Sequence, residues 1–201
     1  MAQTMEVRIL EGASSLFYRF GFSRVRFSEI AKEVGITTRT IYNYFPNKLS
    51  LSKAVSEYSI NQMLNELSAI VEKKLPFPET TVSSLKVVYR ELNKRLPAYH
   101  KDSSCQNGEM NSQVMLDPDI SGFFRSRVEL AVKEGYYEKD APFDMMMQIL
   151  LCQVHYCFPM DRSLTTDRVD EDYFINSILL ILSTCATDKG RQKFNEYFES
   201  K

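Results

Sequence analysis

A run of polar residues from Thr37 to Thr40 carries side chains that can read nucleic acid. The guanidinium of Arg39 can donate two hydrogen bonds to guanine O6 and N7, and threonine methyl groups can contact the methyl group of thymine. Thr37 is a good helix N-cap, and this would place Thr38, Arg39 and Thr40 in the first helical turn. Because the N-terminal turn of a recognition helix contacts base edges, we interpret these residues as base-reading.

Residues on either side of this run can hold the phosphate backbone. Tyr42, Asn43 and Tyr44 carry polar tips at the far end of the same predicted helix, and Lys48 opens the next one. The alternative for Thr38, Arg39 and Thr40 is an exposed helix face without a ligand, and for Tyr42 and Tyr44 it is that one of the two is partly buried in the core. The predicted DNA-binding residues are Arg26, Ser28, Thr37, Thr38, Arg39, Thr40, Tyr42, Asn43, Tyr44 and Lys48.

Three short predicted helices position this run. Apolar residues in Ile9–Phe20 and Phe27–Val34 follow the i, i+3, i+4, i+7 spacing of an amphipathic helix, and a glycine follows each stripe. Gly35 favours a tight turn into the third helix, because glycine tolerates a positive φ. Phe45 precedes Pro46, where that helix is expected to end. The pattern predicts a helix-turn-helix whose second helix enters the major groove.

The rest of the chain is also predicted to be helical. A long helix follows its cap Asn47 toward Val71, and a stripe from Leu85 to Leu96 is expected to end at Pro97. Asp119 is the expected cap of a further helix, which Gly135 closes.

Two segments, Phe143–Phe158 and Tyr173–Cys185, are apolar around most of their circumference and are predicted to be the last two long helices. Helices of this kind need cover on more than one side. We expect the core to cover one side and a second subunit the other.

The net charge of −1 is distributed unevenly. Residues 1–63 hold eight Lys/Arg against five Asp/Glu, which favours a polyanionic partner for that part, although charge alone fits a solvated face equally well. The composition is 44% hydrophobic and 25% charged, as in a globular protein. No apolar run approaches the ~18 residues of a membrane span, and residues 1–11 do not resemble a signal peptide. We therefore expect a cytoplasmic protein.

From Arg8 to about Tyr58 the chain resembles the TetR family of bacterial transcriptional regulators. Many matches at fixed spacing make this resemblance specific, whereas the remainder is similar only in the layout of its helices. The matching residues are Ile9, Leu10, Ala13, Leu16, Phe17, Gly21, Phe22, Ile30, Ala31, Val34, Gly35, Ile36, Thr40, Ile41, Tyr42, Tyr44, Phe45 and Lys48.

The resemblance implies an all-α homodimer in which the last two long helices of each subunit form a four-helix bundle. It also implies a ligand cavity in the body, and release from DNA when that cavity is filled. Residues Thr37–Asn43 would form most of the recognition helix. Arg26 and Arg39 depart from the family pattern, which usually has a small residue at each position. Arg26 would add a phosphate contact, and Arg39 would change the bases that are read.

Six aromatic and methionine side chains of the body are candidates for lining a ligand cavity, and plain core packing is the alternative for each. They are Tyr89, Met110, Met115, Phe123, Phe124 and Met147. Cys152 and His155 are spaced to share a helix face, but Cys157 would point elsewhere and no further ligand stands nearby in sequence. We therefore predict no metal site, no cofactor and no Cys–His nucleophile.

The predicted fold class is all-α, with a three-helix helix-turn-helix domain joined to a larger helical ligand-binding and dimerisation domain. We divide the chain into a DNA-binding domain of residues 1–47, a connecting helix of residues 48–71 and a sensing domain of residues 72–201. The leading hypothesis is a homodimeric repressor that leaves a palindromic operator in double-stranded DNA when a small molecule binds. The alternative is a helical small-molecule-binding or scaffolding protein without site-specific DNA binding. An enzyme has little support, because the sequence shows no phosphate-binding glycine loop, paired-carboxylate site or histidine cluster.

Overall fold

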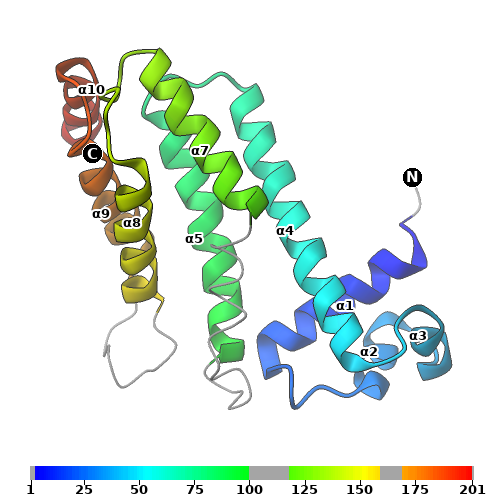
Figure 1. Cartoon of the computed structure of the whole chain (residues 1–201). Coiled ribbons are helices and arrows are strands. Elements are labelled where there is room, and N and C mark those ends of the chain that lie inside the picture. Colours follow the sequence, from blue (N-terminus) through cyan, green and yellow to red (C-terminus); the bar gives the residue numbers. More distant parts are fainter. Residues whose placement is uncertain (1–2, 100–117, 159–168, 201) are drawn as a thin grey trace.

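The computed structural model describes residues 3–99, 118–158 and 169–200, and over these ranges the chain forms helices joined by turns and loops (Figure 1). The fold is therefore all-α, as predicted. The helices are α1 (Met5–Phe20), α2 (Phe27–Val34), α3 (Thr38–Tyr44), α4 (Lys48–Glu72), α5 (Glu79–Tyr99), α7 (Pro118–Lys133), α8 (Phe143–Cys157), α9 (Glu171–Ser183) and α10 (Asp188–Glu199). None of the helices in these ranges combines the length and apolar character needed to cross a lipid bilayer.

The first three helices and the start of α4 enclose a small core of their own. Each of α1, α2 and α3 is amphipathic and turns its apolar stripe inward, because burying that stripe removes apolar surface from water. Leu51 and Val55 of α4 complete this core from the other side. Its most buried members, at 0% exposure, are Ile9, Ala13, Ile30, Ile41 and Leu51.

Helix α4 connects this domain to the rest of the molecule (Figure 1). Its first turns belong to the N-terminal core, whereas Met63, Leu67 and Ile70 pack in a second cluster with Val87 of α5 and Ile120 of α7. Hydrogen bonds also join the middle of α4 to α1. Figure 1 shows α5 and α7 beside α4, and α8, α9 and α10 on the side of the body away from α1–α3.

Three expectations about helix bounds were wrong. Helix α5 continues through Pro97 to Tyr99, so the proline does not end it. Helix α7 begins at Pro118, one residue before the expected cap Asp119. Proline is favoured in the first turn of a helix, since it lacks only an N–H that has no helical partner there.

The third error concerns the end of the chain, where α10 follows the two apolar helices. Helices α8 and α9 are therefore not the last ones. Thr187 caps α10 by accepting a hydrogen bond from the amide of Gly190, and Phe194 anchors the helix in the body core at 1% exposure. Gly190 permits the close packing, because a Cβ there would lie 2.1 Å from the carbonyl oxygen of Tyr136.

Candidate nucleic-acid interface and cavity

The turn between α2 and α3 sets the direction of the predicted reading helix. Gly35 adopts φ +72°, in the left-handed region that favours glycine. The amide of Ile36 donates to the carbonyl of Ala31 at 2.9 Å and closes the end of α2. Thr37 then caps α3, with its side-chain oxygen accepting from the amide of Thr40 at 3.2 Å. The predicted cap and turn are both present.

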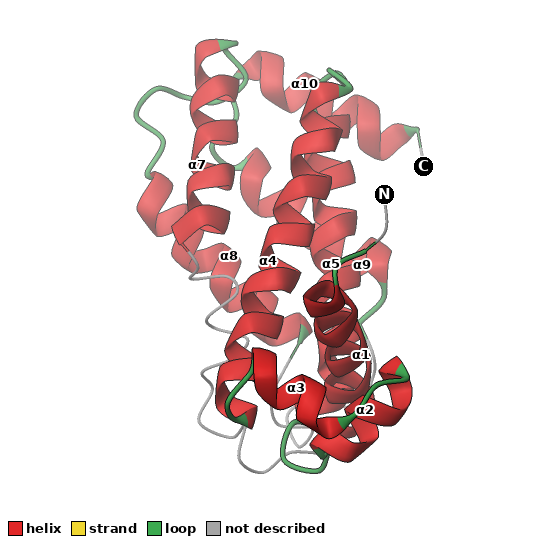
Figure 2. Ribbon diagram, turned by 90° about the vertical axis from the view of Figure 1, so that its right-hand side faces the viewer, coloured by secondary structure: helices red, strands yellow, loops and turns green. Residues whose placement is uncertain are grey.

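The first turn of α3 presents polar side chains to solvent. Thr38 and Arg39 are exposed, as is Asn43 one turn later. No hydrogen bond or ion pair to the described part of the chain occupies Arg39, so its guanidinium is available for a ligand outside the protein. Thr40 is half-buried, and its hydroxyl lies 2.9 Å from that of Thr37. Figure 2 shows α3 at the outer surface of the N-terminal domain, in front of α1 and α2.

The two tyrosines of α3 combine exposure with partial packing. Tyr42 is 56% exposed, and its ring packs against that of Phe27 with centroids 4.8 Å apart. Tyr44 is 45% exposed beside Phe45. Packing of this kind limits ring movement while about half of each side chain stays exposed, which suits a contact to the DNA backbone.

The other predicted backbone contacts lie around the helix-turn-helix. Arg26 and Ser28 are exposed at the start of α2, where the Arg26 amide donates to the carboxylate of Glu29 at 2.7 Å. Lys48 is half-buried at the start of α4. Its amino group donates to the carbonyl oxygen of Ser23 at 3.1 Å and lies 4.5 Å from the ring centre of Phe22. Lys48 thus has an intramolecular role in addition to the predicted phosphate contact.

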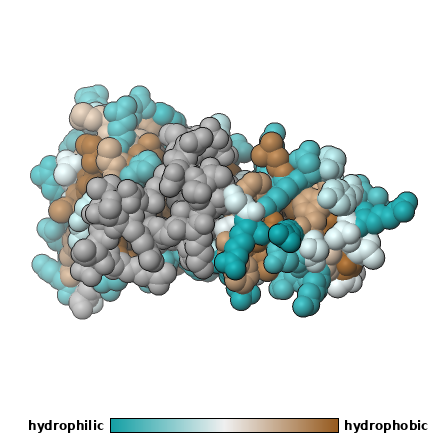
Figure 3. All heavy atoms as spheres, turned by 90° about the horizontal axis from the view of Figure 1, so that it is seen from below, coloured by the Kyte–Doolittle hydropathy of each residue, from teal (hydrophilic) through white to brown (hydrophobic). Residues whose placement is uncertain are grey.

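Figure 3 shows hydrophilic side chains spread over much of the N-terminal domain on the face seen from below.

Two positioning residues were missed by the sequence reasoning. Arg8 of α1 donates to the carbonyl oxygen of Val34 at 2.9 Å and so satisfies the last turn of α2. Gly12 allows α1 and α2 to approach closely, because a Cβ there would lie 2.5 Å from Val34 Cγ2. Neither role has a local sequence signal, since both depend on how the two helices cross.

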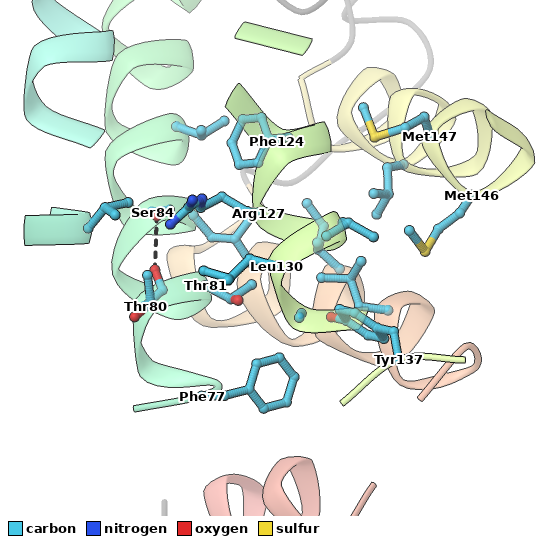
Figure 4. Close-up of a pocket in the computed structure, with 18 of the residues that line it drawn as sticks. Phe77, Thr80, Thr81, Ser84, Phe124, Arg127, Leu130, Tyr137, Met146 and Met147 are labelled. Atoms are coloured by element: carbon cyan, nitrogen blue, oxygen red, sulfur yellow. Dashed lines mark hydrogen bonds between the residues drawn. The ribbon is translucent and has the colours of Figure 1, made fainter. Parts of the chain in front are cut away.

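A cavity of about 600 Å³ lies in the body between the end of α4 and helices α5, α7, α8 and α9 (Figure 4). Most of its wall is apolar, including Leu85, Val88, Phe124, Val128, Val154 and Phe174. Its volume falls within the roughly 300–1,000 Å³ range of small-molecule sites. The helix packing therefore leaves room for an organic ligand next to the end of α4.

The six predicted ligand-binding residues divide into three groups. Phe124 and Met147 line the cavity. Tyr89 does not line it: its hydroxyl donates to the carbonyl of Val169 at 3.0 Å, and its ring packs against Phe158 and Phe174. Phe123 also lies outside the lining and packs edge-on against Phe124 in the cluster around α4. Met110 and Met115 lie outside the described residues.

Several polar lining residues were missed, although they share a pattern. Thr81 and Ser84 lie on the same helical stripe as Leu85 and Val88, and Arg127 lies on the stripe of Phe124, Val128 and Ala131. A polar residue that continues an apolar stripe is a signal for a buried polar site. Such a residue cannot be distinguished from a boundary position until the neighbouring helices are placed.

The cysteine and histidine residues of α8 do not converge. Cys152 and His155 are exposed, whereas Cys157 is buried. Burial raises the pKa of the Cys157 thiol to about 11. His155 Nδ1 lies 2.9 Å from the carbonyl oxygen of Leu151. Among the residues that the structure describes, no group of three metal-ligating side chains comes together.

Helices α8 and α9 pack against each other and leave an apolar face uncovered. Gln153 of α8 donates to the hydroxyl of Ser177 of α9 at 2.9 Å across their contact. Large apolar side chains remain exposed on the two helices: Met145 by 56%, Ile149 by 46%, Tyr156 by 55%, Tyr173 by 49% and Leu180 by 65%. On α8 these residues and Cys152 recur at helical spacing, so they form one face. Clustered exposure of this kind marks an interaction surface.

A helix-turn-helix whose second helix exposes a polar first turn is a motif typical of DNA-binding proteins. The comparisons with known proteins agree. The family model described as "Bacterial regulatory proteins, tetR family" matches residues 9–55. An uncharacterised HTH-type transcriptional regulator of Bacillus subtilis, YhgD, is 24% identical over 132 residues, which are 63% of this chain and 69% of that protein.

Solved structures show the same fold. A Mesorhizobium loti protein assigned to the TetR family of transcriptional regulators superposes with a TM-score of 0.68 at 15% identity, over 92% of this chain and 100% of that one. A transcriptional regulator of Cytophaga hutchinsonii gives 0.65 at 16% identity, over 88% and 93%. Residues 9–55 of the chain thus match the TetR family of bacterial regulatory proteins, and the described residues share the fold of a regulator assigned to that family. Proteins of this family are DNA-binding regulators rather than enzymes.

Proposed function

We propose that the protein is a ligand-responsive repressor that binds a palindromic operator as a homodimer and leaves it when a small molecule fills the body cavity. The observation that carries this proposal is the exposed first turn of α3, where the guanidinium of Arg39 has no partner within the described residues. In this proposal residues 1–47 form the DNA-binding domain, residues 48–71 form the connecting helix, and residues 72–201 bind the ligand and form the dimer interface. Such a repressor works on the chromosome in the cytoplasm.

The apolar face of α8 and α9 supports a homodimer. Five large side chains exposed on two adjacent helices would lose contact with water in a symmetric interface, in which the same patch meets itself. Two copies related in this way would place two α3 helices on one side of the assembly. Successive major grooves on one side of DNA lie about 34–36 Å apart, so the operator is expected to be a near-palindrome.

The course of α4 supports coupling between the cavity and the DNA. The helix begins four residues after Tyr44, the end of α3, and Val71 near its other end lines the cavity. Two contacts fix its middle to α1: the hydroxyls of Tyr18 and Ser59 lie 2.9 Å apart, and Tyr58 donates to Glu11 at 2.9 Å. A ligand that favours a different position of α4 would therefore change the spacing of the two α3 helices. The effect is a shift between two populated states.

Selection of purified protein against random DNA duplexes at a fixed moderate salt concentration tests this proposal. We expect enrichment of a palindrome whose half-sites lie about one helical turn apart. Weak, salt-sensitive binding without enrichment would instead support a helical ligand-binding or scaffolding protein. Mass spectrometry of the denatured protein, run in parallel, detects a co-purified ligand, and the selection is then repeated after refolding without it.

A further inference from the structure

The wall of the body cavity contains one half-buried basic group, Arg127, among its apolar side chains. Arg127 extends from α7, and Figure 4 shows its guanidinium directed toward α5, near Ser84. Thr80 and Thr81 of α5 line the same region. Methionines of α8 and the ring of Phe124 line other parts of the wall (Figure 4). The cavity therefore has a polar corner between α5 and α7 and an otherwise apolar interior.

Arg127 has no partner in the described part of the protein. Its Nε atom is shielded from solvent and makes no hydrogen bond there. No ion pair formed within residues 3–99, 118–158 and 169–200 includes Arg127. Its neighbours one turn away on α7 are all apolar: Phe123, Phe124, Leu130 and Ala131. No carboxylate on its own helix face is therefore close enough to neutralise it.

Two other charged residues line the cavity. Glu134 is exposed two turns further along α7, and no ion pair joins it to Arg127. Lys74 is exposed just after α4. The cavity lining thus holds two positive groups, Arg127 and Lys74, and one negative group, Glu134. Glu134 lies two helical turns from Arg127 along α7.

The hydroxyl groups of α5 that line the cavity together with Arg127 are only partly occupied. Ser84 donates to the backbone carbonyl of Thr80 at 2.9 Å, and Thr80 donates to that of Leu75 at 2.8 Å. No hydrogen bond to a described residue occupies the hydroxyl of Thr81. A guanidinium carries a permanent positive charge, and its planar array of donors matches the two oxygens of a carboxylate. Arg127 therefore offers donors for one anionic group, and the hydroxyl of Thr81 is a further donor in the same cavity lining.

We infer that the effector is an apolar molecule bearing a single anionic group, of the carboxylate type, that pairs with Arg127 while its apolar part fills the space along Leu85, Val88 and Val154. This inference rests on the proposed function, in which the cavity is the effector site. Shielding part of a charged group from water without a partner is costly, and the Nε of Arg127 is shielded in this way. A ligand that supplies the counter-charge therefore gains both the ion pair and the apolar contacts. A neutral ligand of the same shape gains only the apolar contacts.

Straight-chain alkanoates of eight to fourteen carbons, compared with the corresponding alcohols, test the inference by isothermal titration of the free protein below the critical micelle concentration. We expect at least one alkanoate to bind about 10- to 150-fold more tightly than its alcohol, as a charge-assisted hydrogen bond implies. Equal affinity for each pair, or binding of no member of the series, would overturn the inference. This comparison uses the unaltered protein and does not depend on any variant.

Two variants of α7 assign the effect to one side chain. Arg127→Met keeps an apolar stem of similar shape, so we expect it to lose the preference for the alkanoate and keep the affinity for the alcohol. Lys133→Met removes the same charge from an exposed position of that helix outside the cavity lining, and it should leave both affinities unchanged. An Arg127→Met protein that retains the preference would contradict the assignment.

The titration is made without DNA, so its result is independent of the duplex selection. If the selection enriches no operator but the alkanoates bind through Arg127, the proposed repressor function fails and the anion site stands. If an operator is found and the alkanoates show no preference over alcohols, the ligand class fails and the repressor function stands.

Discussion

The N-terminal domain and the body pack their apolar residues to different degrees. In the first, the stripes of α1, α2 and α3 close on one another and on α4, and the residues at their centre are 0% exposed. In the second, the helices surround a cavity of about 600 Å³ and leave the apolar face of α8 and α9 uncovered. Close packing favours one fixed geometry. A core that contains a cavity and leaves an apolar face exposed can instead bind a ligand in the cavity and a partner on the face. The difference fits a rigid DNA-reading unit attached to an adaptable one.

Leu180→Glu, in the uncovered face, is expected to have the largest effect. A carboxylate introduced at a side chain that is 65% exposed would be buried without a partner if two copies pair there. We expect a monomer by light scattering, and an operator affinity lower by about 10²–10⁴-fold because two half-sites are no longer bound together. Phe198→Glu, at an exposed apolar position of α10, is the control and should remain dimeric.

Thiol labelling checks the same interface at pH 8. Cys152 shares the exposed face of α8, so a maleimide should react with it slowly in the dimer and rapidly in Leu180→Glu. Cys157 should stay unreactive in both, because it is buried and its pKa of about 11 keeps it protonated until the pH approaches that value. Equal labelling of Cys152 in the two proteins would place the interface elsewhere.

Matched truncations compare the two kinds of packing directly. Ile41→Ala removes a fully buried side chain from the closed N-terminal core and should lower the free energy of unfolding by about 2–5 kcal/mol. Leu150→Ala removes a half-buried side chain that lines the cavity, and we expect a loss of about 1 kcal/mol, since part of its surface already faces the open space. Urea unfolding followed by circular dichroism measures both. A larger loss for Leu150→Ala would reverse the comparison.

Arg39→Ala tests the exposed first turn of α3 without altering the core. We expect operator binding to weaken by about 1–3 kcal/mol and base preference to relax at one position of each half-site. Titration of the selected duplex and of its single-base variants measures both quantities. Lys133→Ala removes the same charge from the body and should not affect preference at any base. A uniform loss over all sequences would assign Arg39 to phosphate contact instead.

Thr37→Ala should have the smallest effect. The loss of the hydrogen bond from the Thr40 amide to the Thr37 side chain is expected to reduce the stability of the N-terminal domain by about 1 kcal/mol. Thr37→Ser keeps the cap and should restore most of that stability. If the serine variant is as unstable as the alanine variant, the methyl group rather than the cap matters at this position.

The sequence predicted the N-terminal domain well because its determinants are local. The positive φ of Gly35 and the caps Thr37 and Asn47 can each be expected from a few neighbouring residues. Helix α10 was missed because it is mostly polar and one fully buried aromatic, Phe194, anchors it. The local rule at Pro97 also failed, since α5 continues past that residue.

The cavity residues were harder to predict, because their roles depend on contacts between helices distant in sequence. Tyr89 and Phe123 have the residue types of a ligand site, yet they pack in the core and in the α4 cluster. Arg127 has the type of a surface residue, yet it lies in the cavity wall. Residue type alone does not decide which side of a helix faces a space that several other helices enclose.

The unbroken course of α4 has a mechanical consequence. A helix of 25 residues at about 1.5 Å per residue is about 37 Å long, so a tilt of about 5° at the cavity end displaces the other end by about 3 Å. In the proposed homodimer, two symmetric subunits would double this change in the distance between their α3 helices, to about 6 Å, which is half the roughly 12 Å width of a major groove. If the protein responds to a ligand as proposed, that ligand would need to move the cavity wall very little, because the length of α4 amplifies the displacement.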